Sequence, residues 1–189
     1  KTELTALKRQ VKDPNNKDIV FLEKLIADKE GAILKKEERT AAEYFDLSVD
    51  NKNAQGTKMY LDGENLAILD PQGTAYVLSL SGKSLDRRDS SAVKGASIIT
   101  HYQDKVYVYR KGVGIFEITP DGKNTKVIDN DKDWKDVVDL NSYNGNLYLL
   151  DRGGDEVYKY LVAEKGFSQK SSYFAAGQKP DLENATSLA

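Results

Sequence analysis

The run most suggestive of metal binding in this 189-residue chain is Asp129-Asn130-Asp131-Lys132-Asp133, which places carboxylates at alternating positions. Calcium loops begin in this way, because alternating side chains supply the oxygen ligands that Ca²⁺ prefers. A complete loop has glycine at its sixth position and glutamate at its twelfth, and this chain has Trp134 and Leu140 there. We therefore interpret the run as a solvated loop, and we expect neither a metal site nor a cofactor.

Catalytic patterns are also incomplete. His101 is the sole histidine, and the sequence shows no paired base or metal partner that would turn it into a general base. No serine lies in a G-x-S-x-G turn, so a serine nucleophile is not indicated. Gly112-Val113-Gly114 lacks the third glycine and the following helix of a phosphate cradle. We expect no catalytic residue and interpret His101 as structural.

Four side chains are the candidates for contacts with a ligand or partner, since Trp and Arg are favoured anchors at interfaces. Arg110, Lys111 and Arg152 lie at or just after the ends of predicted strands, and Trp134 lies in a longer loop. Functional residues concentrate on loops that a rigid scaffold holds. The alternative interpretation is that these four are ordinary surface residues.

The elements that would position these loops repeat about every 41 residues. Each copy is a tight turn followed by an apolar strand, as in Asp62-Gly63-Glu64-Asn65-Leu66-Ala67-Ile68-Leu69-Asp70 and Asn144-Gly145-Asn146-Leu147-Tyr148-Leu149-Leu150-Asp151. A period in this range is typical of propeller blades. The first strands are expected over 57–61, 96–102 and 137–143, the third over 74–80, 114–119 and 156–162, and the fourth over 85–89, 125–129 and 168–174.

The second strands are apolar on both faces. Leu66, Val106 and Leu147 begin one face, and the residues after them in the chain begin the other, because side chains alternate along a strand. A sheet that buries both faces must be covered on both sides. We therefore predict an all-β fold, a β-propeller of about three four-stranded antiparallel blades stacked on one another as a partial ring.

The ends of the chain suggest incomplete blades. Tyr44-Phe45 and Thr57 return as Tyr173-Phe174 and Thr186. Residues 43–50 are expected to be the outer strand of another blade, and 184–189 the start of a fourth. Because known propellers use about four to eight blades, we expect either a fragment of a longer protein or a homodimer in which two copies complete the ring.

Residues 1–42 are predicted to be a helical segment and linker, and 43–189 the propeller. Asp18 to Glu30 places Ile19, Leu22 and Ile26 on one helical face, with Gly31 as a C-terminal cap. Phe21, Leu22 and Leu25 offer an alternative cap for an open blade face. No run approaches the length of a membrane span, so we expect no membrane contact by this segment itself.

The cadence of each copy, a "DG-x-LYVLD" run followed by "VY-x-Y", resembles the NHL and TolB-like propellers more than WD repeats. Tyr44-Phe45-Asp46-Leu47-Ser48 is similar to uncharacterised bacterial proteins in which an extracytoplasmic propeller follows a helical segment and a membrane span, with a PPM-type phosphatase domain in some of them. The resemblance implies an extracytoplasmic, membrane-tethered setting. The phosphatase's aspartate motifs are absent from this sequence, so the resemblance carries no phosphatase activity.

Composition sets the remaining bounds. The net charge is −2, with acids and bases interspersed, so no basic stripe indicates nucleic acid. The absence of cysteine excludes disulfides and thiol catalysis. We expect a non-catalytic binding or sensory scaffold for a protein or small-molecule ligand. The alternative is a propeller hydrolase or lyase whose active site is completed by blades outside this chain.

Overall fold

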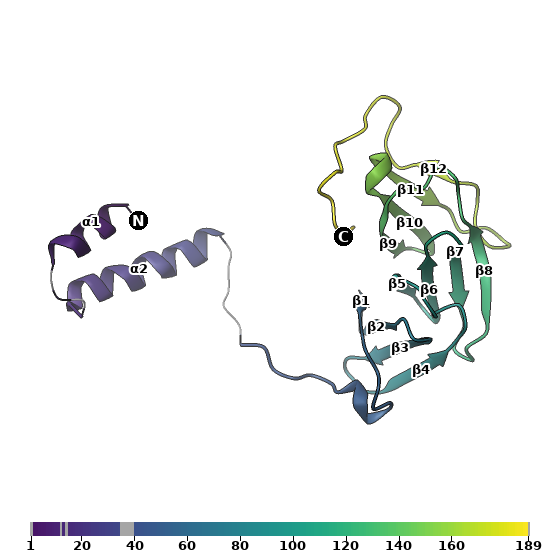
Figure 1. Ribbon diagram of the computed structural model, residues 1–189, viewed down its shortest axis with the longest axis horizontal. Coiled ribbons are helices and arrows are strands. Elements are labelled where there is room, and N and C mark those ends of the chain that lie inside the picture. Colours follow the sequence, from purple (N-terminus) through teal and green to yellow (C-terminus); the bar gives the residue numbers. More distant parts are fainter. Residues whose placement is uncertain (1, 12, 14, 35–39, 189) are drawn as a thin grey trace. The chain divides into compact units, whose positions relative to one another are not determined.

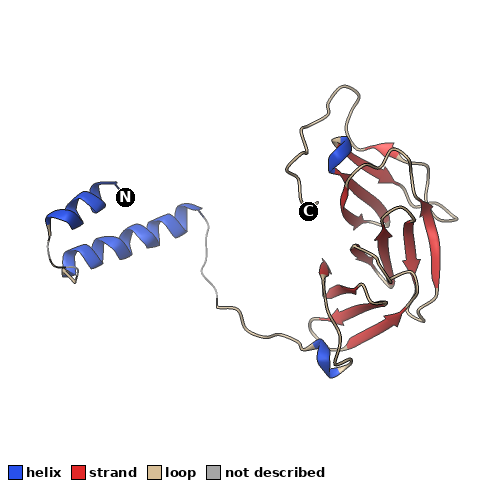
Figure 2. Ribbon diagram, in the orientation of Figure 1, coloured by secondary structure: helices blue, strands red, loops and turns tan. Residues whose placement is uncertain are grey.

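The computed structural model describes residues 2–11, 13, 15–34 and 40–188. The chain divides into two compact units, Lys1–Tyr44 and Phe45–Ala189. Figure 2 shows that the first unit is helical and that the second consists mainly of strands.

The first unit is a helical hairpin of α1 (Thr2–Gln10) and α2 (Lys17–Leu34). Asn16 caps the start of α2, because its Oδ1 accepts hydrogen bonds from the backbone N–H groups of Asp18 and Ile19. The helix continues through Gly31 to Leu34, so the prediction that Gly31 ends it was wrong. As far as the described residues extend, neither helix is long and apolar enough to cross a membrane.

The second unit contains three four-stranded antiparallel sheets, each made of consecutive strands. Blade 1 is β1 (Lys58–Asp62), β2 (Asn65–Asp70), β3 (Thr74–Ser79) and β4 (Leu85–Asp89). Blade 2 is β5 (Ile98–Tyr102), β6 (Lys105–Arg110), β7 (Gly114–Ile118) and β8 (Asn124–Asp129). Blade 3 is β9 (Val137–Tyr143), β10 (Asn146–Asp151), β11 (Glu156–Tyr160) and β12 (Ser171–Ser172).

The three sheets are arranged as successive blades of a partial β-propeller, as the sequence predicted. In Figure 1 the first strands β1, β5 and β9 lie toward one common side, and β4 and β8 lie on the opposite rim. Two corrections concern detail. The turn residue equivalent to Gly63 is Gln103, so the first repeat is 40 residues long rather than 41. The last outer strand, β12, is only two residues long.

Blade stacking creates the core. One cluster joins Ala67, Leu69 and Val77 of blade 1 to Val106 and Val108 of blade 2. A second cluster joins the other face of blade 2 to blade 3; its buried members are Ile98, Tyr107, Tyr109, Ile115, Leu140, Leu147, Leu149 and Tyr160. Both faces of the central blade are therefore covered by a neighbouring sheet, as two apolar faces require.

Buried and half-buried polar side chains link the first strands of the blades. The Tyr60 hydroxyl of β1 lies 2.9 Å from two acceptors in β9, Asn141 Oδ1 and the backbone carbonyl oxygen of Ser142. Ser142 Oγ donates to the backbone carbonyl of His101 in β5 at 2.6 Å. These bonds satisfy polar groups that blade stacking removes from water.

Residues 43–50 do not form the predicted outer strand. Asp46 caps the short 3-10 helix η1 (Leu47–Val49) by accepting from Ser48 N at 2.8 Å, and no neighbouring strand pairs with this segment. Phe45, Leu47 and Ala54 nevertheless pack over Tyr76 and its neighbours on the open face of blade 1. Residues 45–55, the covering segment, thus lie over the face of blade 1 that a preceding blade would cover.

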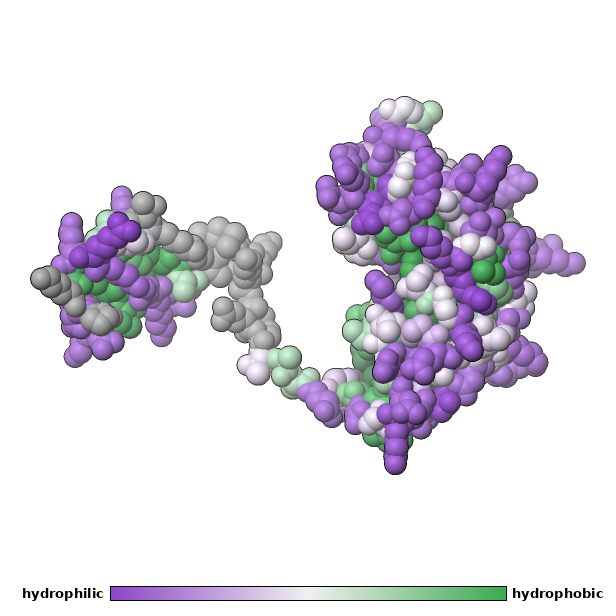
Figure 3. Space-filling view, viewed as in Figure 1, coloured by the Kyte–Doolittle hydropathy of each residue, from purple (hydrophilic) through white to green (hydrophobic). Residues whose placement is uncertain are grey.

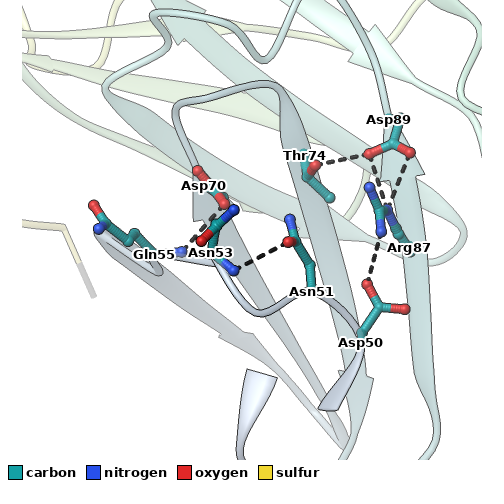
Figure 4. A network of polar contacts seen from close by, with 8 residues as sticks. All are labelled: Asp50, Asn51, Asn53, Gln55, Asp70, Thr74, Arg87 and Asp89. Carbon is teal, nitrogen blue, oxygen red and sulfur yellow. Dashed lines mark hydrogen bonds and ion pairs between the residues drawn. The ribbon is translucent and has the colours of Figure 1, made fainter. Parts of the chain in front are cut away.

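Polar contacts hold this covering segment in place (Figure 4). Arg87 of β4 forms ion pairs with Asp50 of the segment at 3.1 Å and with Asp89 at 3.0 Å. Thr74 Oγ1 donates to Asp89 at 2.7 Å, and this bond together with Arg87 lowers the pKa of the Asp89 carboxyl. The cover is therefore attached to blade 1 through side chains rather than through a strand ladder.

The C-terminal residues lie where a fourth blade was predicted to begin, but residues 184–188 form no strand. Leu188 N donates to Asp139 Oδ2 at 2.7 Å, and Asn141 Nδ2 donates to the Leu188 carbonyl at 3.4 Å. The segment is bound to β9 by these side chains. Residues 184–188 are not part of a sheet, because these bonds involve side chains of β9 and not a ladder of backbone hydrogen bonds.

The interior of the blade stack gives a first prediction. Leu149 is fully buried between blades 2 and 3, so Leu149→Ala should lower the free energy of unfolding by about 2–5 kcal/mol. The exposed Leu161 provides the matched control, and Leu161→Ala should change stability by less than about 1 kcal/mol. Chemical denaturation of both variants measures this. A loss below about 0.5 kcal/mol for Leu149→Ala would contradict the packing of blade on blade.

Candidate functional site

The loops that follow the second strands and the connections between blades meet at one end of the blade stack. Gly95 N donates to the carbonyl of Pro71, Asn130 N to that of Val113, and Arg152 N to that of Asp136. Each bond joins a connection between blades to the loop after a second strand. We call this end the loop face.

Two buried carboxylates anchor the loop face. Asp151, at the end of β10, accepts from Lys135 N at 3.0 Å and from Asp136 N at 2.7 Å. Asp70, at the end of β2, accepts from Gln55 N at 3.2 Å and from Gln72 N at 3.0 Å. Each aspartate fixes the connection that enters its blade, because a buried carboxylate must be paired with hydrogen-bond donors.

Arg110 occupies the third of these equivalent positions, at the end of β6. A guanidinium cannot accept hydrogen bonds, and here the connection is held instead by Gly95 N to the Pro71 carbonyl and Ala96 N to the Val93 carbonyl. The Arg110 guanidinium lies 5.7 Å from the centre of the Phe116 ring. Neither Arg110 nor the adjacent exposed Lys111 has a carboxylate partner among the described residues.

Trp134 is part of the packing between blades 2 and 3. Its ring makes edge contacts with Tyr109 and Tyr160, with centroids 5.8 and 6.4 Å apart, and its Nε1 donates to the Tyr160 hydroxyl at 3.1 Å. Burial raises the pKa of Tyr160 to about 12. Much of the Trp134 surface is therefore already used within the protein.

Arg152 lies in the loop after β10 and contacts the connection that carries Trp134. Its Nη2 and Nε contact Asp136 Oδ2 at 2.6 and 3.0 Å. Trp134 and Arg152 are thus grouped around the connection between blades 2 and 3, whereas Arg110 and Lys111 lie on the loop after β6. Of the four candidate side chains, only those of Arg110 and Lys111 lack a hydrogen-bonded or ion-paired partner in the described chain.

The acidic run at 129–133 forms ion pairs with Lys170. Lys170 Nζ lies 2.7 Å from Asp131 and 2.5 Å from Asp133, and 5.0 Å from the centre of the Tyr158 ring. Burial alone would lower the pKa of Lys170, but the hydrogen bonds that Lys170 donates to both aspartates raise the pKa above its usual range. Lys170 could not be predicted as the partner of this run, because it lies far along the chain, on the segment before β12.

A polar crevice lies near the opposite end of the blades, where the two-residue turns are. It has a volume of about 240 Å³ and is lined in part by Asn65, Arg88, His101 and Gln103. His101 is 1% exposed, and its Nδ1 lies 3.3 Å from Asp62 Oδ2. No partner for His101 is evident in the sequence, because Asp62 belongs to the preceding blade, 39 residues away.

Arg88 fixes the wall of this crevice. The side chain is 4% exposed, and its Nε lies 2.8 Å from Asp86 while its Nη1 donates to the Asp104 carbonyl at 2.7 Å. Burial lowers the pKa of His101, the nearby Asp62 opposes that shift, and the positive charge of Arg88 adds to it. The geometry therefore favours a neutral imidazole next to an acid.

An apolar cavity of about 610 Å³ lies on the open face of blade 3. Tyr148, Leu150 and Val157 form its floor on the sheet, and Phe174 and Leu182 of the C-terminal segment line its other side. In Figure 3, green apolar patches interrupt the largely purple surface of the blades. The C-terminal segment thus covers this face only in part.

No protein-family model matches the chain, and no curated protein matches it in sequence. Among solved structures it is similar to the computationally designed Ika4 protein, with a TM-score of 0.48 and 10% identity over 70% of this chain and 80% of that one. Virginiamycin B lyase from Staphylococcus aureus matches with a TM-score of 0.47 and 14% identity over 69% of this chain and 45% of that one. BamB from Moraxella catarrhalis matches with a TM-score of 0.41 and 9% identity over 61% and 35%. The chain spans less than half the length of these two natural proteins.

The crevice gives a second prediction. The folded state lowers the pKa of His101 from its ordinary value of 6.5. As the pH falls below about 6.5, His101 is therefore protonated in the unfolded chain while it is still neutral in the folded chain. Stability should therefore be complete above this pH and fall as the pH drops through the pKa of the folded state. Aspartates whose pKa is lowered in the folded state, such as Asp89, also stabilise the folded chain, but this stabilisation is lost only below about pH 4.

The sole histidine allows a direct measurement. Its ring resonance in NMR spectra gives the pKa in the folded protein, and denaturation at about pH 7.5 and 5.5 gives the stability change. His101→Gln should reduce this pH dependence. A folded-state pKa above 6.5 would contradict the prediction, and would show that Asp62 outweighs burial and Arg88.

Proposed function

We propose that this chain is a non-catalytic binding or sensory propeller, part of a larger protein, and that its loop face contacts a protein or small-molecule ligand. The observation that carries the proposal is Arg110. Blades 1 and 3 place a buried aspartate at this position to hold their incoming connections. In blade 2 the connection is held by other bonds, which releases the side chain at this position for contact with a ligand.

The chemistry of this position favours an acidic ligand. Arg110 and Lys111 are adjacent cations without an ion pair in the described chain, and the Phe116 ring lies beside the guanidinium. An arginine forms two parallel hydrogen bonds with a carboxylate and is enriched at binding hot spots. We infer a carboxylate-bearing ligand. Trp134 lies on the neighbouring connection between blades, and Arg152 lies in the loop that contacts this connection.

The wider setting belongs to the same proposal. The NHL or TolB-like family, the membrane tether and the extracytoplasmic location rest on the resemblance in sequence alone. Completion of a ring by two copies is also a proposal. The hydrogen bonds of Leu188 to Asp139 and Asn141 show that the C-terminal segment already occupies the side of β9. A partner's first strand would need this place beside β9, so the C-terminal segment would have to move.

One observation favours the alternative of a hydrolase or lyase. The Asp62–His101 pair orients an imidazole in a crevice near the end of the blades opposite the loop face. If Asp62 accepts from Nδ1–H, the Nε2 lone pair is available as a base. This alternative requires further groups from blades outside the chain.

A third prediction tests the binding proposal. With a short oligoglutamate peptide as the probe, Arg110→Ala should weaken binding at least about tenfold, since the contact is charge-assisted. The matched control is Lys165→Ala, which removes an exposed lysine from the turn before β12 and should leave binding unchanged. Titration of the isotope-labelled chain followed by NMR measures the affinity and the location of the site.

Three results would contradict the proposal: no binding, equal weakening by the control, or resonance shifts confined to the opposite end. The alternative is tested in the same samples with p-nitrophenyl acetate. Hydrolysis that His101→Gln abolishes and Arg110→Ala preserves would favour the enzyme.

A further inference from the structure

The helical hairpin of the first unit has very little core of its own. Ile19 is its one buried side chain among the described residues. Half-buried apolar residues surround it: Leu4, Val11, Leu22 and Ile26. A folded segment below about 40 residues, such as the hairpin of α1 and α2, usually needs a partner, a metal or disulfides for stability. Isolated helices shorter than about 12–15 residues, such as α1, are marginal in water.

An apolar surface remains open on α2. Phe21 is 65% exposed and Leu25 is 41% exposed. They are four positions apart, so they are neighbours on one side of the helix. Ile19, Leu22 and Ile26 follow a different stripe, the less exposed one. Green apolar residues are visible on the surface of the hairpin in Figure 3.

Exposed charges flank these two side chains in a symmetric pattern. Lys17 and Asp28 share the stripe of Phe21, at spacings of four and seven positions, and Asp18 and Lys29 share the stripe of Leu25. With the exposed Lys24 three positions after Phe21, the order along one stripe is lysine, phenylalanine, lysine, aspartate. Along the other it is aspartate, leucine, leucine, lysine, of which Leu22 also faces the hairpin core. Lys17, Asp18, Asp28 and Lys29 form no ion pair with another described residue.

We propose that α2 is a dimerisation helix whose partner is the antiparallel α2 of a second copy of this chain. A two-fold axis between the helices would set Phe21 of each copy near Leu25 of the other. On one flank Lys17 of each copy then lies near Asp28 of the other, and on the second flank Asp18 lies near Lys29. The same surface contacts itself with opposite charges matched, which is the condition for a two-fold interface.

The charge pattern favours this partner over a lipid surface. Helices that lie on membranes carry a polar face rich in lysine and arginine. The exposed side of α2 instead carries both acids and bases, and on both flanks an acid of one copy matches a base of the other. This interface involves only the helical unit, and it is independent of the loop face and of any closure of the blade ring.

The fourth prediction is tested by analytical ultracentrifugation of the full chain. As the concentration of the wild-type chain is raised to about 100 µM, a dimer should form. Phe21→Ser should raise its dissociation constant at least about tenfold. Val20→Ser is the matched control: Val20 is 50% exposed on the same helix but about 100° away from Phe21, and its loss should leave the dimer intact. Circular dichroism checks that both variants keep their helices.

A charge exchange identifies the contact itself. Asp28→Lys should weaken the dimer by placing two lysines together, and Lys17→Asp combined with Asp28→Lys should restore it. Positions 17 and 28 are about 16 Å apart along one helix, so a restored dimer requires contact between two copies. A monomeric wild type, a dimer that Phe21→Ser leaves unchanged, or the absence of rescue by the double variant would each overturn the proposal.

Discussion

The structure depends on one constraint: every second strand is apolar on both faces, so each sheet must be covered twice. Valines and leucines on one face and alanine, leucine or tyrosine on the other leave no side that water can occupy at low cost. Blade 2 meets the constraint fully with its two neighbours. Blades 1 and 3 meet it with one neighbour and one covering segment each.

This constraint also explains why the polar groups are placed as they are. Stacking brings the first strands together, and Tyr60, Asn141 and Ser142 bridge them there. It also carries each incoming chain segment across the end of a blade, where Asp70 and Asp151 accept its backbone N–H groups. Arg110 stands out against this arrangement, because it occupies an anchoring position without the anchoring chemistry.

Much of the fold could be predicted from the sequence because its signals are local and repeated. Turn residues, period-two alternation and the recurrence of Leu66, Val106 and Leu147 fix eleven of the twelve strands to within about two residues. The predictions were wrong where contacts with distant parts of the chain determine the local structure. Residues 43–50 have strand-like composition, but with no strand to pair with, Asp46 caps a 3-10 turn instead. Gly31 resembles a helix cap, yet the helix continues through it.

The site was harder to predict, for a physical reason. Side-chain type identifies Arg110 and Trp134 as candidates, but not whether their surfaces are free. Trp134 packs against Tyr109 and donates a hydrogen bond to Tyr160, and Arg152 is ion-paired with Asp136. The pairs His101–Asp62 and Lys170–Asp131 join different blades or distant segments, so a pattern confined to one stretch of sequence does not contain them.

Native-state hydrogen exchange tests the central claim of stacked blades most directly, because protection reports how much structure must open to expose each amide. The account predicts that β6 and β7, covered on both faces, exchange slowest in the chain. Blades 1 and 3 should follow, and β12 and residues 45–55 should exchange fastest within the second unit. Exchange of β6 as fast as that of the covering segment would contradict the stacked arrangement.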